Sequence, residues 1–523
     1  MIKKILQKFR TPRGMTATDW VILAAGLTVF AIISLWTITK SSIWFDEAFG
    51  AYLIHFNFFD VAKYTAGDVH PPMYYWLLKS WSLLFGNSEL ALRSMSVLFA
   101  GIAISFGYAL VHRLFGKKAA RLSLLFMILA PMLVRYSQEM RMYALAAAIS
   151  LAATYVLTYA ITTKKRLPWV IYGVLVSLGM WTHYFTAIVW LSHWLWRAYV
   201  VRQSLGKKAK GFVKAFFSRE WVLAHVVAVG LFLPWLPSLV YQVTNVQVNG
   251  FWIPSVTPTT VPNFLTNVLY YQDQDAVHGW AALIFLVIFV TIITLTALIF
   301  RTLNSKQRES YLLIITLAVM PVILLFILSM PPLRPSFIDR YLLPSTVGIS
   351  LLMGVTLALS SKILRPRWQF LIGAIIVGSM IFGITNVYHF GNYNKNTHTS
   401  NNTRQTIEVL TAKSSGEEPI IAATPWLFYE AVFYSTPAHP VYFINANTQY
   451  VFGSLNMLRD NDQHKIKDLA AFANNHHQIW YIGYTGEENL TAPDSSWKQL
   501  QNLRVDDSIT GKPAYQAIEY QTN

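Results

Sequence analysis

The run WVILAAGLTVFAIISLWTIT, residues 20–39, determines what kind of protein this chain forms. It is long and apolar enough to cross the hydrocarbon core of a bilayer as one helix, which takes about 20 residues. The basic segment 1–19 precedes it, as the start of a signal peptide would. Because the run lacks a small-residue cleavage pattern, we predict that it is retained as the first membrane span.

The composition of the whole chain is that of a membrane protein. Hydrophobic residues make up 54% and charged residues 13% of its 523 positions, which is more apolar and less charged than soluble domains are. The net charge of +17 could indicate nucleic acid binding, but Lys and Arg of membrane proteins collect in cytoplasmic loops, so no nucleic acid partner is predicted. The sequence contains no cysteine, which excludes disulfides and thiolate catalysis.

Segments of spanning length recur as far as residue 388. Eleven transmembrane helices are expected, at 20–39, 94–112, 119–134, 142–162, 168–182, 184–200, 221–241, 280–300, 311–330, 341–360 and 368–388. With a cytoplasmic N-terminus, the inner connections carry 25 Lys and Arg and the outer connections between spans carry 8. This distribution obeys the positive-inside rule. It predicts a cytoplasmic basic N-terminus, 1–19, and a transmembrane domain, 20–388, in the cell membrane.

The first outer loop, 40–93, contains an aromatic segment that is too short to span. Met73 to Phe85 is thirteen residues long, with Lys79 at its centre. We predict an amphipathic helix along the outer interface, begun by Pro72. Further along, Pro131 should end the third span. The polar run 135–141 is then expected below the outer surface, where such a backbone is tolerated only if it is buried or lines a cavity.

After residue 388 the sequence becomes polar. Residues 392–403 are rich in Asn and Thr and are predicted to be a linker. Beyond it, short apolar runs indicate strands and longer ones helices. The predicted strands are Pro419–Thr424, Val441–Ile444 and Ile479–Tyr484, and the predicted helices are Trp426–Tyr434 and Lys465–Ala473. By the count of spans, 389–523 is a small extracytoplasmic α/β domain.

Ionisable side chains from five separate stretches all fall on the predicted outer side. They are Asp46, Glu47, Asp68, His70, Glu139, Arg141, His183, Asp339 and Arg340. Charges beside a bilayer are costly unless they are paired or hydrated, so such a set indicates a functional site. A carboxylate can accept the proton of an acceptor hydroxyl, and cations can neutralise a departing phosphate. The set favours an enzyme that transfers a group from an anionic lipid.

Four motifs carry a resemblance to a known family. They are Asp46-Glu47, His70-Pro71-Pro72 before the aromatic helix, RYSQEMRMY at 135–143, and RYLLP at 340–344. Together they resemble the GT-C glycosyltransferases of the protein O-mannosyltransferase and aminoarabinose transferase type, over roughly residues 20–390. The resemblance implies the GT-C fold, a polyprenyl-phosphate-linked sugar donor, reaction at the outer membrane face, inversion at the anomeric carbon, and Asp46 as general base.

The chain departs from aminoarabinose transferases at one motif. Those enzymes have Glu-Lys-Pro-Pro where this chain has Val69-His70-Pro71-Pro72. If His70 replaces that lysine near the donor phosphate, its charge titrates near neutrality instead of staying fixed.

The predicted catalytic residues are Asp46 and Glu47, with Glu47 orienting Asp46 or the acceptor. Arg141 and Arg340, with His70, are predicted to bind the donor phosphate, because arginine stays charged and offers two parallel donors. For each arginine, the alternative is an ion pair with the neighbouring Glu139 or Asp339 that only fixes a helix end.

Further site candidates are Asp68, Tyr136, Glu139 and His183. Tyr136 and His183 can instead be interfacial side chains, which membrane proteins place at the level of the headgroups. No cofactor is expected. A divalent metal stays open as an alternative, although the acidic residues and His70 show no tight ligand spacing.

The expected partners are the donor, an acceptor glycan, lipid or protein, and the bilayer. The alternative function is a polytopic transporter or flippase of a lipid-linked or anionic substrate. A transporter should carry ionisable or helix-breaking residues near the bilayer midplane. Because the centres of the predicted spans are almost free of charge, the sequence favours the glycosyltransferase.

Overall fold

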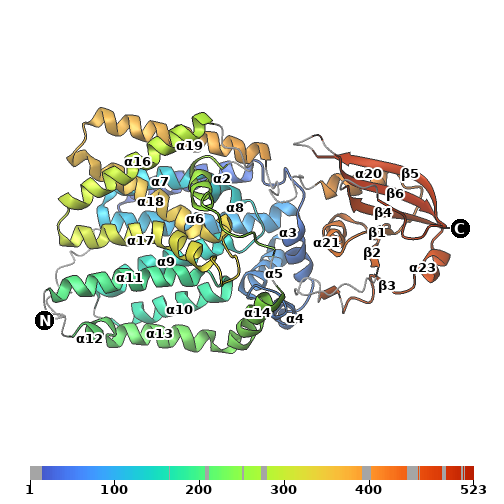
Figure 1. Cartoon of the computed structure of the whole chain (residues 1–523), viewed down its shortest axis with the longest axis horizontal. Coiled ribbons are helices and arrows are strands. Elements are labelled where there is room, and N and C mark those ends of the chain that lie inside the picture. The colour runs from blue at the N-terminus through green and yellow to red at the C-terminus, as the bar shows by residue number, and fades with distance from the viewer. Residues whose placement is uncertain are drawn as a thin grey trace. The chain divides into compact units, whose positions relative to one another are not determined.

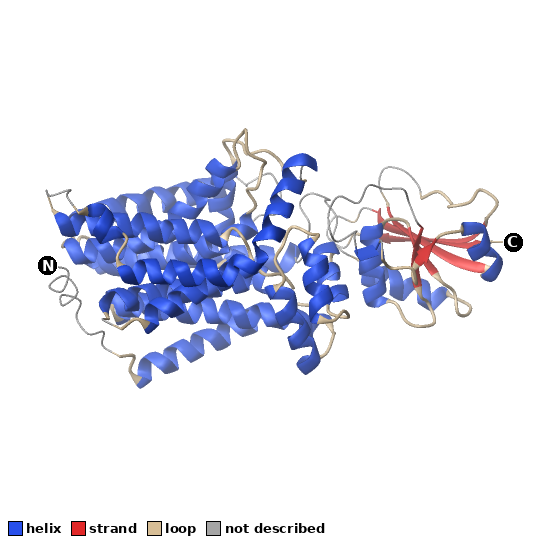
Figure 2. Ribbon diagram, turned by 90° about the horizontal axis from the view of Figure 1, so that it is seen from below, coloured by secondary structure: helices blue, strands red, loops and turns tan. Residues whose placement is uncertain are grey.

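The computed structural model is mostly helical, with one small β-sheet near the C-terminus (Figures 1 and 2). It describes residues 14–163, 165–206, 211–249, 252–271, 279–390, 402–444, 457–458, 460–485, 490–507, 511 and 513–522. Most of the predicted basic N-terminus and of the predicted linker lie outside these ranges. The chain divides into two compact units. The first comprises residues 1–36, 94–138 and 142–388, and the second comprises 37–93, 139–141 and 389–523.

The first unit is a bundle of apolar helices. Eight helices within the described ranges are long and apolar enough to cross a membrane: α2 (Ala17–Leu35), α6 (Glu89–Phe115), α9 (Tyr143–Thr162), Arg219–Val248 within α13 (Arg219–Phe232), η1 (Leu233–Trp235) and α14 (Leu236–Asn249), α16 (Gly279–Thr302), α17 (Ser305–Leu328), Asp339–Lys362 around α18 (Leu343–Leu359), and α19 (Pro366–Phe390). The chain is therefore a multi-pass membrane protein.

The other three predicted spans are also helical. α7 (Lys117–Ile128) and α8 (Pro131–Ser137) form a ninth crossing if this pair, bent by 57°, is one span. α10 (Leu167–Thr182) has only 16 residues, and α11 (Thr186–Leu205) is not among the eight. All eleven predicted segments are thus helices, and eleven crossings stays a prediction.

Pro131 accounts for the bend between α7 and α8. Proline cannot continue a helix because it lacks an N–H group, but it fits the first position of a new one. Accordingly α7 ends at Ile128 and Pro131 begins α8. The polar residues after it pair with α2, where the Ser137 hydroxyl donates to Ser34 Oγ at 3.0 Å and the Gln138 amide to the Ser34 carbonyl at 2.8 Å.

Helix α18 is the most buried of the spans and packs closely on two neighbours. A Cβ atom at Gly354 would lie 2.5 Å from the backbone nitrogen of Ser123 in α7. One at Gly348 would lie 2.9 Å from the backbone nitrogen of Ala318 in α17. Small residues at these points let the backbones approach, which is how helices associate in membranes. α18 therefore fixes the position of the residues at its N-terminus, which include Arg340.

The second unit contains three short helices from the first outer loop: α3 (Phe45–Leu53), α4 (Phe58–Ala66) and α5 (Met73–Phe85). The helix predicted over Met73–Phe85 is confirmed with the same bounds. α4 begins at Phe58 because the Asn57 side chain accepts the backbone N–H groups of Phe59 and Asp60, as a preferred N-cap residue does.

The same unit contains the six-stranded sheet, in the order β3-β2-β1-β4-β6-β5. β3 (Lys465–Ile466), β2 (Val441–Ile444), β1 (Ile420–Ala422) and β4 (Gln478–Tyr484) are parallel, while β6 (Pro513–Gln521) and β5 (Lys498–Asp506) are antiparallel to their neighbours. The helices of this region are α20 (Thr403–Lys413), α21 (Pro425–Tyr434) and α23 (Leu469–Asn475). The predicted class, a polytopic helical membrane protein with a small C-terminal α/β part, is confirmed.

One predicted element is wrong in part. Lys465–Ala473 was expected to be a single helix, but its first two residues form β3, because their backbone pairs with Phe443 and Ile444 of β2. The helix starts later, after Asp468, whose side chain accepts the Ala471 N–H.

Candidate functional site

Helix α3 carries Asp46 in its first turn. The turn is closed by Glu47, whose carboxylate accepts the Trp44 N–H at 3.4 Å in a capping arrangement. The Asp46 side chain is 22% exposed, and Arg141 Nη2 lies 3.6 Å from its Oδ2. Arg141 Nη1 also donates to the Asp46 carbonyl at 3.1 Å and to the Tyr75 hydroxyl at 3.0 Å. The second unit thus brings together two predicted site residues that are 95 positions apart in the sequence.

Glu47 has a different environment, because it is fully buried against Arg93. Arg93 donates to both Glu47 oxygens, from Nε at 2.9 Å and from Nη2 at 2.6 Å. Its remaining donors reach the carbonyls of Ile38, Ser41 and Ser42. Glu47 also accepts the Met140 N–H at 2.8 Å. Glu47 therefore contacts the first turn of α3, which carries Asp46, and its role in orienting Asp46 or the acceptor stays a prediction.

Asp68 and His70 form a third part of the site. Both are buried, and His70 Nδ1 lies 3.3 Å from Asp68 Oδ2. Burial lowers the pKa of His70 below its usual value, although the hydrogen bond with Asp68 opposes the shift, and the charges of Arg141 and Asp46 also act on the ring. A histidine with a lowered pKa is less readily charged than a lysine, which makes it a weaker ligand for phosphate.

The remaining predicted residue of this unit is Glu139. It is completely buried, and its carbonyl accepts the Arg141 N–H at 2.8 Å. The short segment 139–141 thereby contributes Glu139, the Met140 N–H group and Arg141 to the second unit.

The first unit holds an aromatic cluster around Arg340. The guanidinium carbon lies 5.6 Å from the ring centroid of Tyr143 and 5.6 Å from that of Trp252, a cation–π geometry. Tyr143 also contacts Tyr136 and His183. These interactions connect Tyr136, His183 and Arg340, three predicted site residues from separate segments.

Two further residues of this cluster matter for Arg340. The Tyr341 ring packs on those of His183 and Phe185, with centroids 4.7 and 5.0 Å apart. Asp339 accepts from the Asn267 amide at 2.6 Å. Aromatic rings beside an arginine suit a sugar phosphate, whose apolar face can stack while its phosphate meets the cation.

Sequence reasoning missed Arg93 and Tyr75. Arg93 is the last residue before a predicted span, a position where a cation normally faces the headgroups, so only its pairing with Glu47 reveals its role. Tyr75 lies in the helix that was predicted along the outer interface and was given no role in the site, but it is completely buried and contacts Arg141. A tyrosine shortly after the double proline was the available signal for Tyr75.

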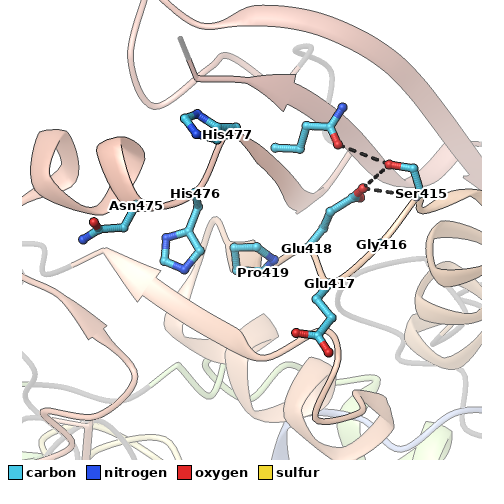
Figure 3. A pocket seen from close by; sticks show the side chains of 9 residues that line it. Ser415, Gly416, Glu417, Glu418, Pro419, Asn475, His476 and His477 are labelled. Carbon is cyan, nitrogen blue, oxygen red and sulfur yellow. Dashed lines mark hydrogen bonds between the residues drawn. The ribbon is translucent and has the colours of Figure 1, made fainter.

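The C-terminal α/β region contains a separate polar cavity of about 240 Å³ (Figure 3). It lies between the loops that precede β1 and β4, and its lining includes Ser415, Glu417, Glu418, His476 and His477. In Figure 3, Ser415 hydrogen-bonds the Glu418 carboxylate, which also accepts from Ser414 and from the Trp480 indole. These bonds satisfy Glu418 within the fold. The cavity is also at the amino ends of the parallel strands, whereas ligands of open α/β sheets bind at the carboxyl ends.

Potential metal ligands do not cluster in the described part of the chain. No group of three or more His, Asp or Glu side chains there is arranged to hold a metal ion.

Comparison with known proteins shows the fold and a family match over part of the chain. A family model for the dolichyl-phosphate-mannose-protein mannosyltransferases matches residues 69–246, the segment that includes His70, Arg93 and Arg141. No curated protein matches the sequence.

Solved structures match nearly the whole chain. ArnT from Cupriavidus metallidurans in the apo state has a TM-score of 0.60 at 15% identity, with 96% of this chain and 98% of that chain covered. Its structure bound to undecaprenyl phosphate has a TM-score of 0.61 with the same identity and coverage. The oligosaccharyltransferase of Archaeoglobus fulgidus in complex with zinc and sulfate has a TM-score of 0.50 at 12% identity, over 80% of this chain and 62% of its own.

At these identities the similarity concerns the fold, while the family model adds a match in sequence over one continuous segment. The resemblance inferred from the four motifs is confirmed: the chain is a multi-pass membrane protein with the GT-C glycosyltransferase fold, similar in residues 69–246 to the dolichyl-phosphate-mannose-protein mannosyltransferases.

Proposed function

We propose that this chain is an integral membrane glycosyltransferase that moves a sugar from a polyprenyl-phosphate-linked donor to an acceptor hydroxyl at the extracytoplasmic face. The observation that carries the proposal is the partly exposed Asp46 carboxylate held beside Arg141 in a chain with the GT-C fold. ArnT, which has this fold, binds undecaprenyl phosphate.

Asp46 is the general base. It accepts the proton of the acceptor hydroxyl as that oxygen attacks C1 of the sugar. The bond between C1 and the phosphate oxygen breaks, and the polyprenyl phosphate leaves with the electron pair of that bond. One direct displacement of this kind inverts the anomeric centre. Arg141 orients the Asp46 carboxylate and adds positive charge for the phosphate, while Glu47 and Arg93 hold the turn that carries Asp46.

Arg340 and Arg141 are the proposed ligands of the donor phosphate. Each arginine stays charged at neutral pH, whereas burial lowers the pKa of His70 and makes its charge less available to a phosphate. Arg340→Ala should raise the KM for a radiolabelled polyprenyl-phosphate sugar by about 10-fold or more, the loss of a charge-assisted hydrogen bond. Arg334→Ala is the control, because Arg334 is exposed and donates only to the Gln247 carbonyl among the contacts described. Equal donor KM values for both variants would remove Arg340 from the donor site.

We also propose that the N-terminus is cytoplasmic and that the C-terminal α/β region is extracytoplasmic. The absence of cysteine makes this simple to test with a membrane-impermeant thiol reagent. Cysteine at the exposed position Ser495 should be labelled in intact cells, and cysteine at the exposed position Lys362 only after the membrane is opened. The reverse pattern would contradict the proposed topology and, with it, an outer-face reaction.

A further inference from the structure

The segment immediately before Asp46 is held by the C-terminal α/β region, within the same compact unit. The Arg404 guanidinium donates to the carbonyls of Thr39 and Lys40 at 3.1 and 3.4 Å, and its backbone N–H donates to Ser42 Oγ at 3.1 Å. The Ile43 N–H donates to the Tyr434 hydroxyl at 2.7 Å. The chain leading into α3 thus takes its conformation from α20 and α21.

Helix α21 also packs along one face of α3. Phe45, Phe49 and Tyr52 are spaced to lie on a single side of a helix. The Tyr429 ring contacts all three, with centroid distances of 6.1, 6.2 and 5.3 Å. The two helices are therefore packed against each other, and we expect a displacement of α21 to shift the turn that carries Asp46.

Glu430, the residue after Tyr429, makes the most direct contact with that turn. Its carboxylate lies beside the backbone N–H of Phe45, the first residue of α3. The first N–H groups of a helix have no partner inside the helix, and a carboxylate is favoured there by the helix dipole. Thr403 Oγ1 at 2.6 Å and the Tyr484 hydroxyl at 3.2 Å fix the other side of the carboxylate.

We propose that the C-terminal α/β region positions the catalytic carboxylate, and that Glu430 is the positioning residue, acting through the Phe45 N–H one residue before Asp46. The role deepens the proposed glycosyl transfer and rests on it for its catalytic consequence. Glu430 acts through the backbone of α3, so it sets the direction of the Asp46 side chain without contacting substrate.

The same region supplies a matched control. Glu418 is also buried, 3% exposed against 2% for Glu430, and it too accepts several hydrogen bonds. Its donors are Ser414, Ser415 and Trp480, all within the α/β region. Truncating Glu418 therefore perturbs the sheet in a similar way without removing an acceptor from α3.

The charge of Glu430 supplies a second readout. Burial raises the pKa of Glu430 to about 7, with a further contribution from Glu47, while the hydrogen bonds from Thr403, Tyr484 and Phe45 oppose the shift. The tyrosines Tyr484 and Tyr515 also face it. Since the folded-state pKa of Glu430 lies above the ordinary glutamate value of 4.5, the folded protein binds a proton that the unfolded chain has lost. Stability then falls as the pH rises from about 4.5 to about 7 and changes no further above that.

The test compares Glu430→Ala, Glu430→Gln and Glu418→Ala in the full-length protein, by hydrogen exchange of the first turn of α3 and by donor kinetics. Glu430→Ala should speed exchange of the Phe45 amide by about 10-fold or more, because the carboxylate beside that N–H is removed. Glu430→Ala should lower kcat by about 10- to 100-fold, the effect of a misplaced reacting group, with the donor KM unchanged.

Glu430→Gln keeps an acceptor oxygen, so it should retain most of kcat and the slow exchange, while losing the fall in stability between pH 4.5 and 7.

Glu418→Ala should leave exchange in α3 and kcat at wild-type values. Wild-type exchange in Glu430→Ala, or equal acceleration in Glu418→Ala, would overturn the proposal. If Glu430→Ala does not fold, Glu430→Gln decides instead. The proposal would be overturned if the pH dependence of stability in Glu430→Gln were that of the wild type, or if Glu430→Gln lost as much kcat as Asp46→Asn. A wild-type protein without transfer activity would refute the proposed function, while the exchange measurement would still decide whether Glu430 holds α3.

Discussion

Replacing Asp46 by asparagine should lower the rate of sugar transfer by about 10²- to 10⁴-fold, the usual contribution of a general base. Asparagine has nearly the same shape as aspartate and can keep the contacts with Arg141, so the variant should insert into the membrane and fold normally. The rate is measured as product formed from a radiolabelled polyprenyl-phosphate sugar at saturating donor.

Asp60→Asn is the matched control for Asp46→Asn. Asp60 lies in the same outer loop and also in the first turn of a helix, where it accepts from the Asn57 side chain, and its rate should be that of the wild type. Full activity of Asp46→Asn would remove Asp46 as the base. An equal loss in the two variants would show that any neutralised acid in this loop has the same effect.

Replacing Arg93 by methionine should destabilise the protein more than any other substitution proposed for it. It removes one partner of a pair whose side chains are both completely buried, and an uncompensated buried charge costs roughly 3–5 kcal/mol. The second unit should unfold at a lower temperature in detergent, and transfer activity should fall because Glu47 no longer holds the turn with Asp46.

Two further variants test this prediction, one as a control and one as a rescue. Arg113→Met makes the same substitution near the other end of α6, where the guanidinium is partly exposed and packs over Tyr159, so it should change the melting temperature much less. Adding Glu47→Gln to Arg93→Met removes the unpaired charge and should recover part of the lost stability. If Arg93→Met and Arg113→Met melt at the same temperature, the Glu47–Arg93 pair does not support the site.

The helical part of the fold was predictable because apolar runs of spanning length directly indicate membrane helices. A stretch such as 280–300 has no other stable state in a bilayer, since every backbone polar group must be paired within the helix. Met73–Phe85 was predictable to the residue because Pro72 favours a helix start and the glycine at position 86 ends it with a positive φ of 85°.

The α/β region was less predictable, because its strands depend on partners distant in the sequence. β5 reads KQLQNLRVD, which has too few apolar residues to signal a strand, and it forms as the edge strand paired with β6. Lys465–Ile466 are strand residues only because β2 lies beside them. The Asp468 cap was visible in the sequence and would have placed the start of α23 correctly.

The candidate site was likewise predictable only in part. Several residues of the site were predictable from the sequence, since Asp46, Asp68, His70 and Arg141 do lie in one unit. The assignment of roles was not, because Asp46 and Glu47 are adjacent in sequence and differ only in what surrounds them. Glu47 is enclosed by Arg93 and backbone N–H groups, while Asp46 is partly exposed. The contribution of Glu430 was not readable either, since it reaches α3 from almost 400 positions further along the chain.

A glycosyltransferase breaks the bond between the sugar and the lipid phosphate, whereas a flippase only moves the intact lipid across the bilayer. The most direct test is the fate of the label when the purified protein in proteoliposomes receives a polyprenyl phosphate carrying a radiolabelled sugar, with wild type and Asp46→Asn compared. We expect wild-type protein to pass the sugar to an acceptor and release polyprenyl phosphate, and Asp46→Asn not to do so. Label that stays on the lipid and crosses the bilayer equally with both proteins would contradict the proposed glycosyl transfer and identify a flippase.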